Sequence, residues 1–196
     1  RIVDEAGSEL PERRQGRLEF KGPSATSGYF NNAEKTHRLF NGSWLDSGDL
    51  AYIADGDVYL TGRIKDVIIR AGRNIYPHEL EETVGQIEGI RKGCVAVFAS
   101  RDDRTGTERL VVLAETRHSA ARERNRLETA IAQASLALLE TPPDDIVLVP
   151  PRTVPKTSSG KIRRSAARDL YERGALVEPG REPWLQFARL FFEGTK

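Results

Sequence analysis

A lysine at the end of a run of small residues is the first group in this sequence that could do chemistry. Lys161 closes the segment 155–161, Pro-Lys-Thr-Ser-Ser-Gly-Lys. Ser and Gly let the backbone bend sharply, so a mobile loop could bring the ammonium to an anionic transition state and withdraw it. The segment is not a P-loop, because Pro155 stands where that motif needs glycine and Ile162 where it needs Ser or Thr. Taken alone, it could equally be a surface loop that ends in lysine.

A carboxylate and a guanidinium in the first third of the chain could complete a nucleotide site. Asp49 and Arg63 each follow a glycine directly. An aspartate can accept hydrogen bonds from two vicinal hydroxyls, as a ribose offers them, and an arginine suits phosphate or ribose oxygens. Asp49 could also be no more than a turn-capping residue.

A hairpin is predicted between these two residues. The apolar runs 50–54 and 58–61 flank Asp55-Gly56, a pair that tolerates positive φ in a tight turn. The hairpin could place Arg63 beside Asp49, where its two strands meet.

Two further sites lie where the composition changes from β-rich to mixed. Lys65 stands at this junction, where a charged residue is typical of a solvated hinge. Gly72 and Arg73 belong to the segment 70–77, which is rich in hydrogen-bond donors and could line a channel or a partner surface. A plain connecting loop before a helix at Pro77 is the alternative.

Composition narrows the class of protein. The 196 residues are 38% hydrophobic, and 30 basic against 29 acidic side chains give a net charge of +1, so no global field favours nucleic acid or an anionic membrane. No apolar run is long enough for a membrane span, and the first residues are no signal peptide. The absence of methionine suggests a piece of a longer polypeptide.

The single cysteine and the three histidines carry little chemistry. Cys94 lies in an apolar run and is expected to be a buried thiol, and one cysteine cannot form an internal disulfide, so a cytoplasmic location is expected. His37, His78 and His118 lack metal-ligand spacing. A metal-hydrolase site is therefore not predicted.

The predicted fold class is α+β, with three parts along the chain. Residues 1–63 form a small, β-rich, barrel-like subdomain, 64–177 an α+β domain, and 178–196 a linker with an apolar tail. The α+β domain is predicted to contain strands at 67–69, 94–99, 109–115 and 146–149, a helix from Pro77, a helix from a Ser119 cap to Glu140, and a last helix at 162–173. On the long helix, Leu127, Ile131, Ala134 and Leu138 are predicted to form the apolar face.

Five motifs in order carry a resemblance to a known family. They are Gly28-Tyr29-Phe30-Asn31, Trp44 to Leu50, Gly62 to Asp66, Gly72 to Glu81, and Pro155 to Arg163. They resemble the C-terminal portion of the acyl-adenylate-forming superfamily, which includes acyl-CoA synthetases, adenylation domains of peptide synthetases and luciferases. Within it, segments 64–69 and 72–77 look most like the fatty acyl-AMP ligases.

The resemblance implies a role for each candidate residue. Asp49 resembles the ribose-binding aspartate, Arg63 the arginine that contacts ribose and phosphate, and Lys65 the hinge about which a mobile lid domain swings. Lys161 resembles the lysine that bridges the carboxylate substrate and the α-phosphate. Gly72 and Arg73 would lie beside the pantetheine arm of the acceptor thiol.

The implied reaction joins a fatty acid to AMP from ATP, with Mg²⁺, and then transfers the acyl group to an acyl carrier protein. CoA is the alternative acceptor, and a noncatalytic adenylation-like binding module is the alternative from another class. ATP and Mg²⁺ would be bound mainly by residues upstream of Arg1, so the chain alone is expected to be inactive. The apolar tail could lead into a downstream fused domain.

Overall fold

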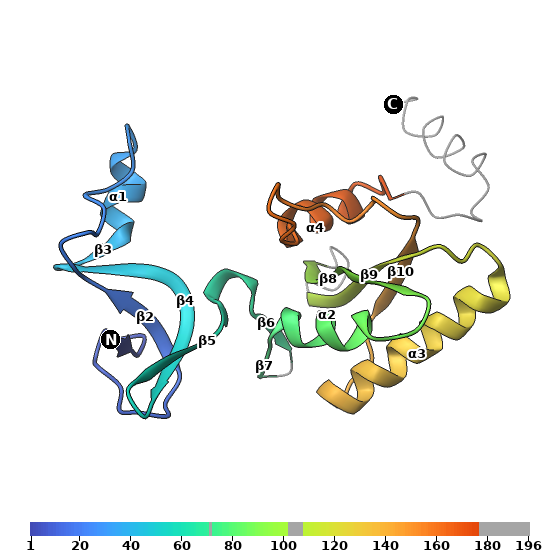
Figure 1. Cartoon of the computed structure of the whole chain (residues 1–196), viewed down its shortest axis with the longest axis horizontal. Coiled ribbons are helices and arrows are strands. Elements are labelled where there is room, and N and C mark those ends of the chain that lie inside the picture. Colours follow the sequence, from blue (N-terminus) through green and yellow to red (C-terminus); the bar gives the residue numbers. More distant parts are fainter. Residues whose placement is uncertain (71, 102–107, 177–196) are drawn as a thin grey trace. The chain divides into compact units, whose positions relative to one another are not determined.

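The computed structural model describes residues 1–70, 72–101 and 108–176, and these form two compact units (Figure 1). The first unit is Arg1–Val67 and the second is Ile68–Lys196. The contacts therefore divide the chain four residues after the predicted boundary at Arg63, which leaves Lys65 in the first unit. The predicted tail at 178–196 lies outside the described residues. No helix in the described ranges is both long and apolar enough to cross a bilayer.

The first unit is an antiparallel sheet of five strands. The order is β1-β2-β4-β3, with β5 also paired to β4. The strands are β1 (Ile2–Val3), β2 (Gly16–Phe20), β3 (Phe40–Asn41), β4 (Trp44–Ala54) and β5 (Asp57–Arg63). The long strand β4 therefore pairs with three neighbouring strands, and it contains the candidate residue Asp49.

The predicted hairpin is confirmed. Strands β4 and β5 pair through Ala54 and Asp57, and the two turn residues between them, Asp55 and Gly56, have φ of 54° and 83°. Two successive positive φ values match the twist of the flanking strands, and Asp and Gly adopt them at low cost.

The first part of the chain is rich in strands, as predicted, but it also contains a helix that the sequence analysis did not predict. Helix α1 (Ala33–Leu39) stands between β2 and β3. The side chain of Asn32 caps it by accepting a hydrogen bond from the Lys35 amide. No residue of α1 is buried, so the helix has no apolar face that a sequence pattern could reveal.

The second unit is built on a three-stranded sheet of order β10-β9-β8. Strand β8 (Ile90–Arg101) is antiparallel to β9 (Glu108–Thr116), and β10 (Asp145–Val149) is parallel to β9. A two-stranded hairpin of β6 (Ile68–Arg70) and β7 (Arg73–Ile75) precedes it. Three helices complete the unit, namely α2 (Pro77–Gly85), α3 (Ala121–Leu139) and α4 (Arg164–Glu172).

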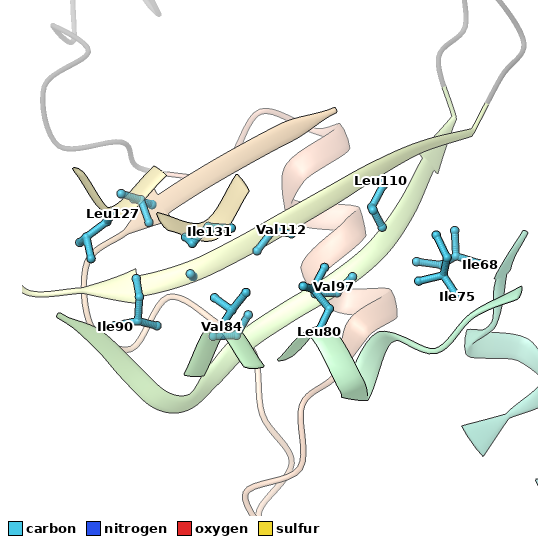
Figure 2. Close-up of a cluster of buried hydrophobic side chains, with 13 residues drawn as sticks. Ile68, Ile75, Leu80, Val84, Ile90, Val97, Leu110, Val112, Leu127 and Ile131 are labelled. Atoms are coloured by element: carbon cyan, nitrogen blue, oxygen red, sulfur yellow. The ribbon is translucent and has the colours of Figure 1, made fainter. Parts of the chain in front are cut away.

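Each face of this sheet has its own hydrophobic cluster, because successive side chains of a strand point to opposite faces. Leu80 and Val84 of α2 and Leu127 and Ile131 of α3 pack on one face, with Val97 of β8 (Figure 2). The other face packs against α4, and this cluster contains Ala96, Phe98, Val111, Leu113, Val147, Val149 and Ala167. The sheet thus separates α2 and α3 from α4.

The predicted helices exist, but their ends and one buried position differ. The N-cap of α3 is Ala120, without a side-chain bond, so the predicted cap at Ser119 is wrong by one residue. Leu138 is 41% exposed, whereas Ser135 is buried and donates to the Thr141 carbonyl. The last helix begins at Arg164, two residues later than predicted, because Ile162 still pairs with Lys156 in a β-bridge.

Candidate active site

Asp49 and Arg63 face each other across the β4–β5 ladder. The register pairs them directly, and Arg63 Nε lies 3.5 Å from Asp49 Oδ1. The side chains are 28% exposed for Asp49 and 59% for Arg63. An ion pair this long and this exposed contributes little to stability. Both groups can therefore turn to a ligand at small cost.

A β-bulge sets this pairing. An unbroken ladder from the turn would place Asp49 opposite Gly62, but the register shifts between Leu50 and Ala51. The extra residue in β5 brings Arg63 to Asp49 instead, and directly opposed residues project to the same face of a sheet. The bulge thus aims both side chains at one place.

A second irregularity holds the backbone of Asp49. Gly48 has φ of 75°, and its amide donates to Asp46 Oδ1 at 2.8 Å. The amide of Asp49 donates to Ser47 Oγ at 3.0 Å, and the same hydroxyl donates to the Leu18 carbonyl at 2.9 Å. The register of the β2–β4 ladder shifts here, and the side chains of Asp46 and Ser47 take the place of strand partners for the Gly48 and Asp49 amides.

Lys161 lies near the tip of a closed turn, which we call the lysine loop and define as residues 155–163. The Thr157 amide donates to the Lys161 carbonyl at 2.9 Å, and the Lys161 amide donates to Thr157 Oγ1 at 3.0 Å. Gly160 turns the chain with φ of 83°, and the Arg163 amide closes the loop on the Pro155 carbonyl at 3.0 Å. The loop is therefore shaped by its own short-range bonds.

The ammonium of Lys161 is exposed and available. It makes no hydrogen bond or ion pair with any residue that the structure describes. Asp49 and Arg63 belong to the first unit and Lys161 to the second.

Three contacts hold the lysine loop, one at each flank and one at Lys156 within it. The Val154 amide donates to the buried Oε1 of Glu115 at 2.9 Å, Lys156 Nζ lies 3.1 Å from the buried Cys94 Sγ, and Arg164 pairs with Glu81. Cys94 is buried, as predicted. Sequence reasoning gave no role to Glu81 or Glu115, because the groups that they bind lie far away in the chain.

Glu115 is buried as a charged group. Burial raises the pKa of its carboxyl, but hydrogen bonds from the Val154 and Arg152 amides and from Arg91 outweigh this, so the pKa lies below its usual value. Its side chain is 1% exposed and ion-paired to Arg91. A carboxylate that accepts several hydrogen bonds stays ionised.

The remaining predicted residues lie on either side of the junction between the units. Lys65 is exposed in the short 3₁₀ helix η1 (Ile64–Asp66). Gly72 has φ of 75° in the turn of the β6–β7 hairpin, and Arg73 pairs with Glu140 at 2.5 Å. The candidate residues therefore form three groups, the Asp49–Arg63 pair, the hairpin turn and the lysine loop, while Lys65 lies separately in η1.

No group of three or more His, Cys, Asp or Glu side chains in the described ranges is arranged to hold a metal ion.

Comparison with known proteins identifies the family. No family model matches the chain. A protein of Caulobacter vibrioides named as an acyl-CoA synthetase is 41% identical over 173 residues, 86% of this chain and 29% of that protein. The 4-hydroxyphenylalkanoate adenylyltransferase of Mycobacterium tuberculosis is 35% identical over 190 residues, 87% of this chain and 30% of that enzyme.

Solved structures agree in fold. McyG A-PCP complexed with phenylalanyl-adenylate has a TM-score of 0.80 at 34% identity, over 89% of this chain and 32% of that one. A structure from work on fatty acyl-adenylate ligases of E. coli and L. pneumophila has a TM-score of 0.76 at 35% identity, over 89% of this chain and 30% of that one. The chain spans about 30% of the length of these curated relatives. It belongs to the acyl-adenylate-forming superfamily and corresponds to the C-terminal portion of its members.

Proposed function

We propose that the full-length protein containing this chain joins a fatty acid to AMP from ATP, releases pyrophosphate, and transfers the acyl group to the phosphopantetheine thiol of a carrier protein. The observation that carries the proposal is the loosely paired Asp49 and Arg63, which a β-bulge turns to the same face. The similarity to fatty acyl-adenylate ligases supports the substrate class.

Asp49 and Arg63 divide the nucleotide between them. The carboxylate accepts hydrogen bonds from the two ribose hydroxyls, and the guanidinium donates to ribose or phosphate oxygens. Their mutual contact of 3.5 Å is long enough to be exchanged for these bonds.

Lys161 offsets the charge of the transition state. A carboxylate that attacks the α-phosphorus of ATP approaches like charge, and an ammonium between the two groups stabilises the arrangement. The lid, which is predicted to comprise residues 64–177, would swing at Lys65 to deliver this group to the nucleotide site.

The transfer step would use a different part of the lid. In a second orientation, Gly72 and Arg73 would lie beside the pantetheine arm, where the turn between β6 and β7 lets the backbone come close. Acceptance of CoA instead of a carrier protein would place the enzyme among the acyl-CoA synthetases. A cytoplasmic location is proposed on the single, buried thiol of Cys94.

ATP–pyrophosphate exchange by the full-length protein tests the proposal. We expect exchange that depends on added fatty acid and yields acyl-AMP. Absence of exchange with every acid tried would favour the noncatalytic binding module. Parallel transfer assays with CoA and with a phosphopantetheinylated carrier protein identify the acceptor.

A further inference from the structure

Glu81 joins two helices that lie on opposite faces of the second unit's sheet. It belongs to α2, and its carboxylate binds Arg164, the first residue of α4, through two parallel bonds. Arg164 Nε lies 2.8 Å from Oε1 and Nη2 lies 2.6 Å from Oε2. Such a bidentate pair fixes orientation as well as distance.

The same carboxylate also binds the edge of the sheet. Strand β8 is the outer strand next to β9, and its Val97 amide donates to Glu81 Oε1 at 3.0 Å. Glu81 therefore bridges α2, the edge of β8 and α4 at one point. The side chains are 11% exposed for Glu81 and 21% for Arg164, so water competes weakly for the pair.

Arg164 stands in an unfavourable place for α4 itself. The N-terminus of a helix carries partial positive charge, so a cation in the first turn is disfavoured there. The α4 helix has no side-chain cap bond and no acidic residue in its first turn. Stability of the isolated helix therefore does not explain an arginine at this position, whereas the bond to Glu81 does.

The contact between Glu81 and Arg164 can affect the lysine loop, because Arg164 is the next residue in the chain. It directly follows the lysine loop, which closes when the Arg163 amide donates to the Pro155 carbonyl. Ile162 and Ala167 pack in the cluster under α4, but Lys161 and the loop tip are exposed. The direction in which the loop projects thus depends on how its two flanks are held.

We propose that Glu81 is a positioning residue for acyl-AMP formation, which acts through Arg164 to hold the lysine loop and hence Lys161. The inference rests on the proposed function. Neither Glu81 nor Arg164 touches substrate in this role, and the transfer step does not require their contact.

Glu81→Gln in the full-length enzyme keeps the shape of the side chain and removes its charge. Single-turnover acyl-AMP formation at saturating ATP and fatty acid should fall about 10-fold, because small misplacements of a catalytic group are costly. The KM for ATP should stay unchanged, since Asp49 and Arg63 are untouched. Transfer from added acyl-AMP should stay within about 2-fold of the unaltered enzyme. Equal loss in both half-reactions would reduce Glu81 to a structural residue and overturn the inference.

A double-mutant cycle tests the route through Arg164. Arg164→Gln should slow acyl-AMP formation about as much as Glu81→Gln does. The double variant should be no slower than either single variant, because both changes break the same contact. Multiplied losses in the double variant would contradict the route.

Asp144→Asn is the matched control. Asp144 likewise accepts from a backbone amide, that of Leu110 at 2.6 Å, and pairs with an arginine, Arg70 at 2.8 Å, but it lies away from the lysine loop in the chain. This variant should leave the rate of acyl-AMP formation unchanged.

Hydrogen exchange separates this inference from the proposed function. Glu81→Gln should raise amide exchange in peptides covering 155–164, and Asp144→Asn should not. If the unaltered protein forms no acyl-AMP but Glu81→Gln still frees the loop, the proposed function fails and the positioning of the loop stands. Unchanged exchange in this segment overturns the positioning, whatever the activity of the protein.

Discussion

The Asp49–Arg63 pair and the lysine loop hold their functional groups in different ways. Asp49 and Arg63 stand on paired strands, and the ladder with its bulges sets both backbones. Lys161 stands on a turn that is closed by its own short-range bonds, is held by Glu115 and Glu81 at its flanks, and contacts Cys94 through Lys156. In the proposed reaction, the two groups that bind the nucleotide stand on a sheet, whereas the group that must arrive in one step stands on a loop with separate anchors.

Of the substitutions considered, Lys161→Ala should have the largest effect on acyl-AMP formation. Acyl-AMP formation by the full-length enzyme should fall about 10²–10³-fold, because one preorganised group that stabilises transition-state charge is typically worth that much. Transfer from added acyl-AMP should be much less affected. Single-turnover assays of both half-reactions measure this.

Lys92→Ala is the control for this change, because Lys92 is an exposed lysine on β8 in the same unit. It should leave both half-reactions unchanged. Equal losses in adenylation and transfer for Lys161→Ala would mean that the two regions do not divide the chemistry as proposed.

Asp49→Asn should act on nucleotide binding instead. Loss of the charge weakens the hydrogen bonds to the ribose, which are typically worth about 1.5–3 kcal/mol, so the KM for ATP should rise roughly 10- to 100-fold. Asp55→Asn provides the comparison, since Asp55 also pairs with an arginine, Arg13 at 2.9 Å, in the same hairpin. An equal change of KM in both variants would argue against a ribose contact at Asp49.

Glu115→Gln should test how much the buried carboxylate that anchors the lysine loop contributes to stability. The Val154 amide and Arg91 would lose a charged partner, which should destabilise the fold by about 1–3 kcal/mol near neutral pH. Because the pKa of Glu115 is lowered in the folded state, its stabilisation is present above the unfolded value of 4.5 and is lost as pH falls below it. The loss caused by the substitution should therefore shrink in acid.

Urea unfolding of the full-length enzyme at neutral pH and at about pH 4 checks this. Glu82→Gln is the control, because Glu82 is exposed on α2. A destabilisation that is equal at both pH values would show that the charge of Glu115 is not the cause.

The same comparison separates what the sequence could predict from what it could not. Asp55-Gly56 predicts the hairpin because the turn requires positive φ at both residues. The facing of Asp49 and Arg63 was predicted correctly, yet it depends on a bulge that the turn alone would not give. Helix α1 was not predicted, because it buries no side chain. The contacts of Glu81 and Glu115 were not predicted, because their partners are distant in the chain.

On α3 the helical period predicts a buried stripe but not its edges. Leu127 and Ile131 are buried as predicted, while Ser135 replaces Leu138 at the end of the stripe. Ser135 can be buried because its hydroxyl bonds the Thr141 carbonyl where the chain leaves the helix. A hydrophobic pattern cannot predict such a hydrogen bond between a side chain and the backbone.

Gly160→Ala should give the smallest effect and tests the internal order of the lysine loop. A Cβ at Gly160 would meet no atom within 4 Å, so the cost comes only from its φ of 83° and should be about 1 kcal/mol. Gly22→Ala is the matched control, because that position is equally open and does not need a left-handed backbone. Acyl-AMP formation should slow several-fold in the first variant and stay constant in the second. Equal rates in both would show that the loop tip adapts its backbone freely, and the positioning of Lys161 would then depend on the flanking anchors alone.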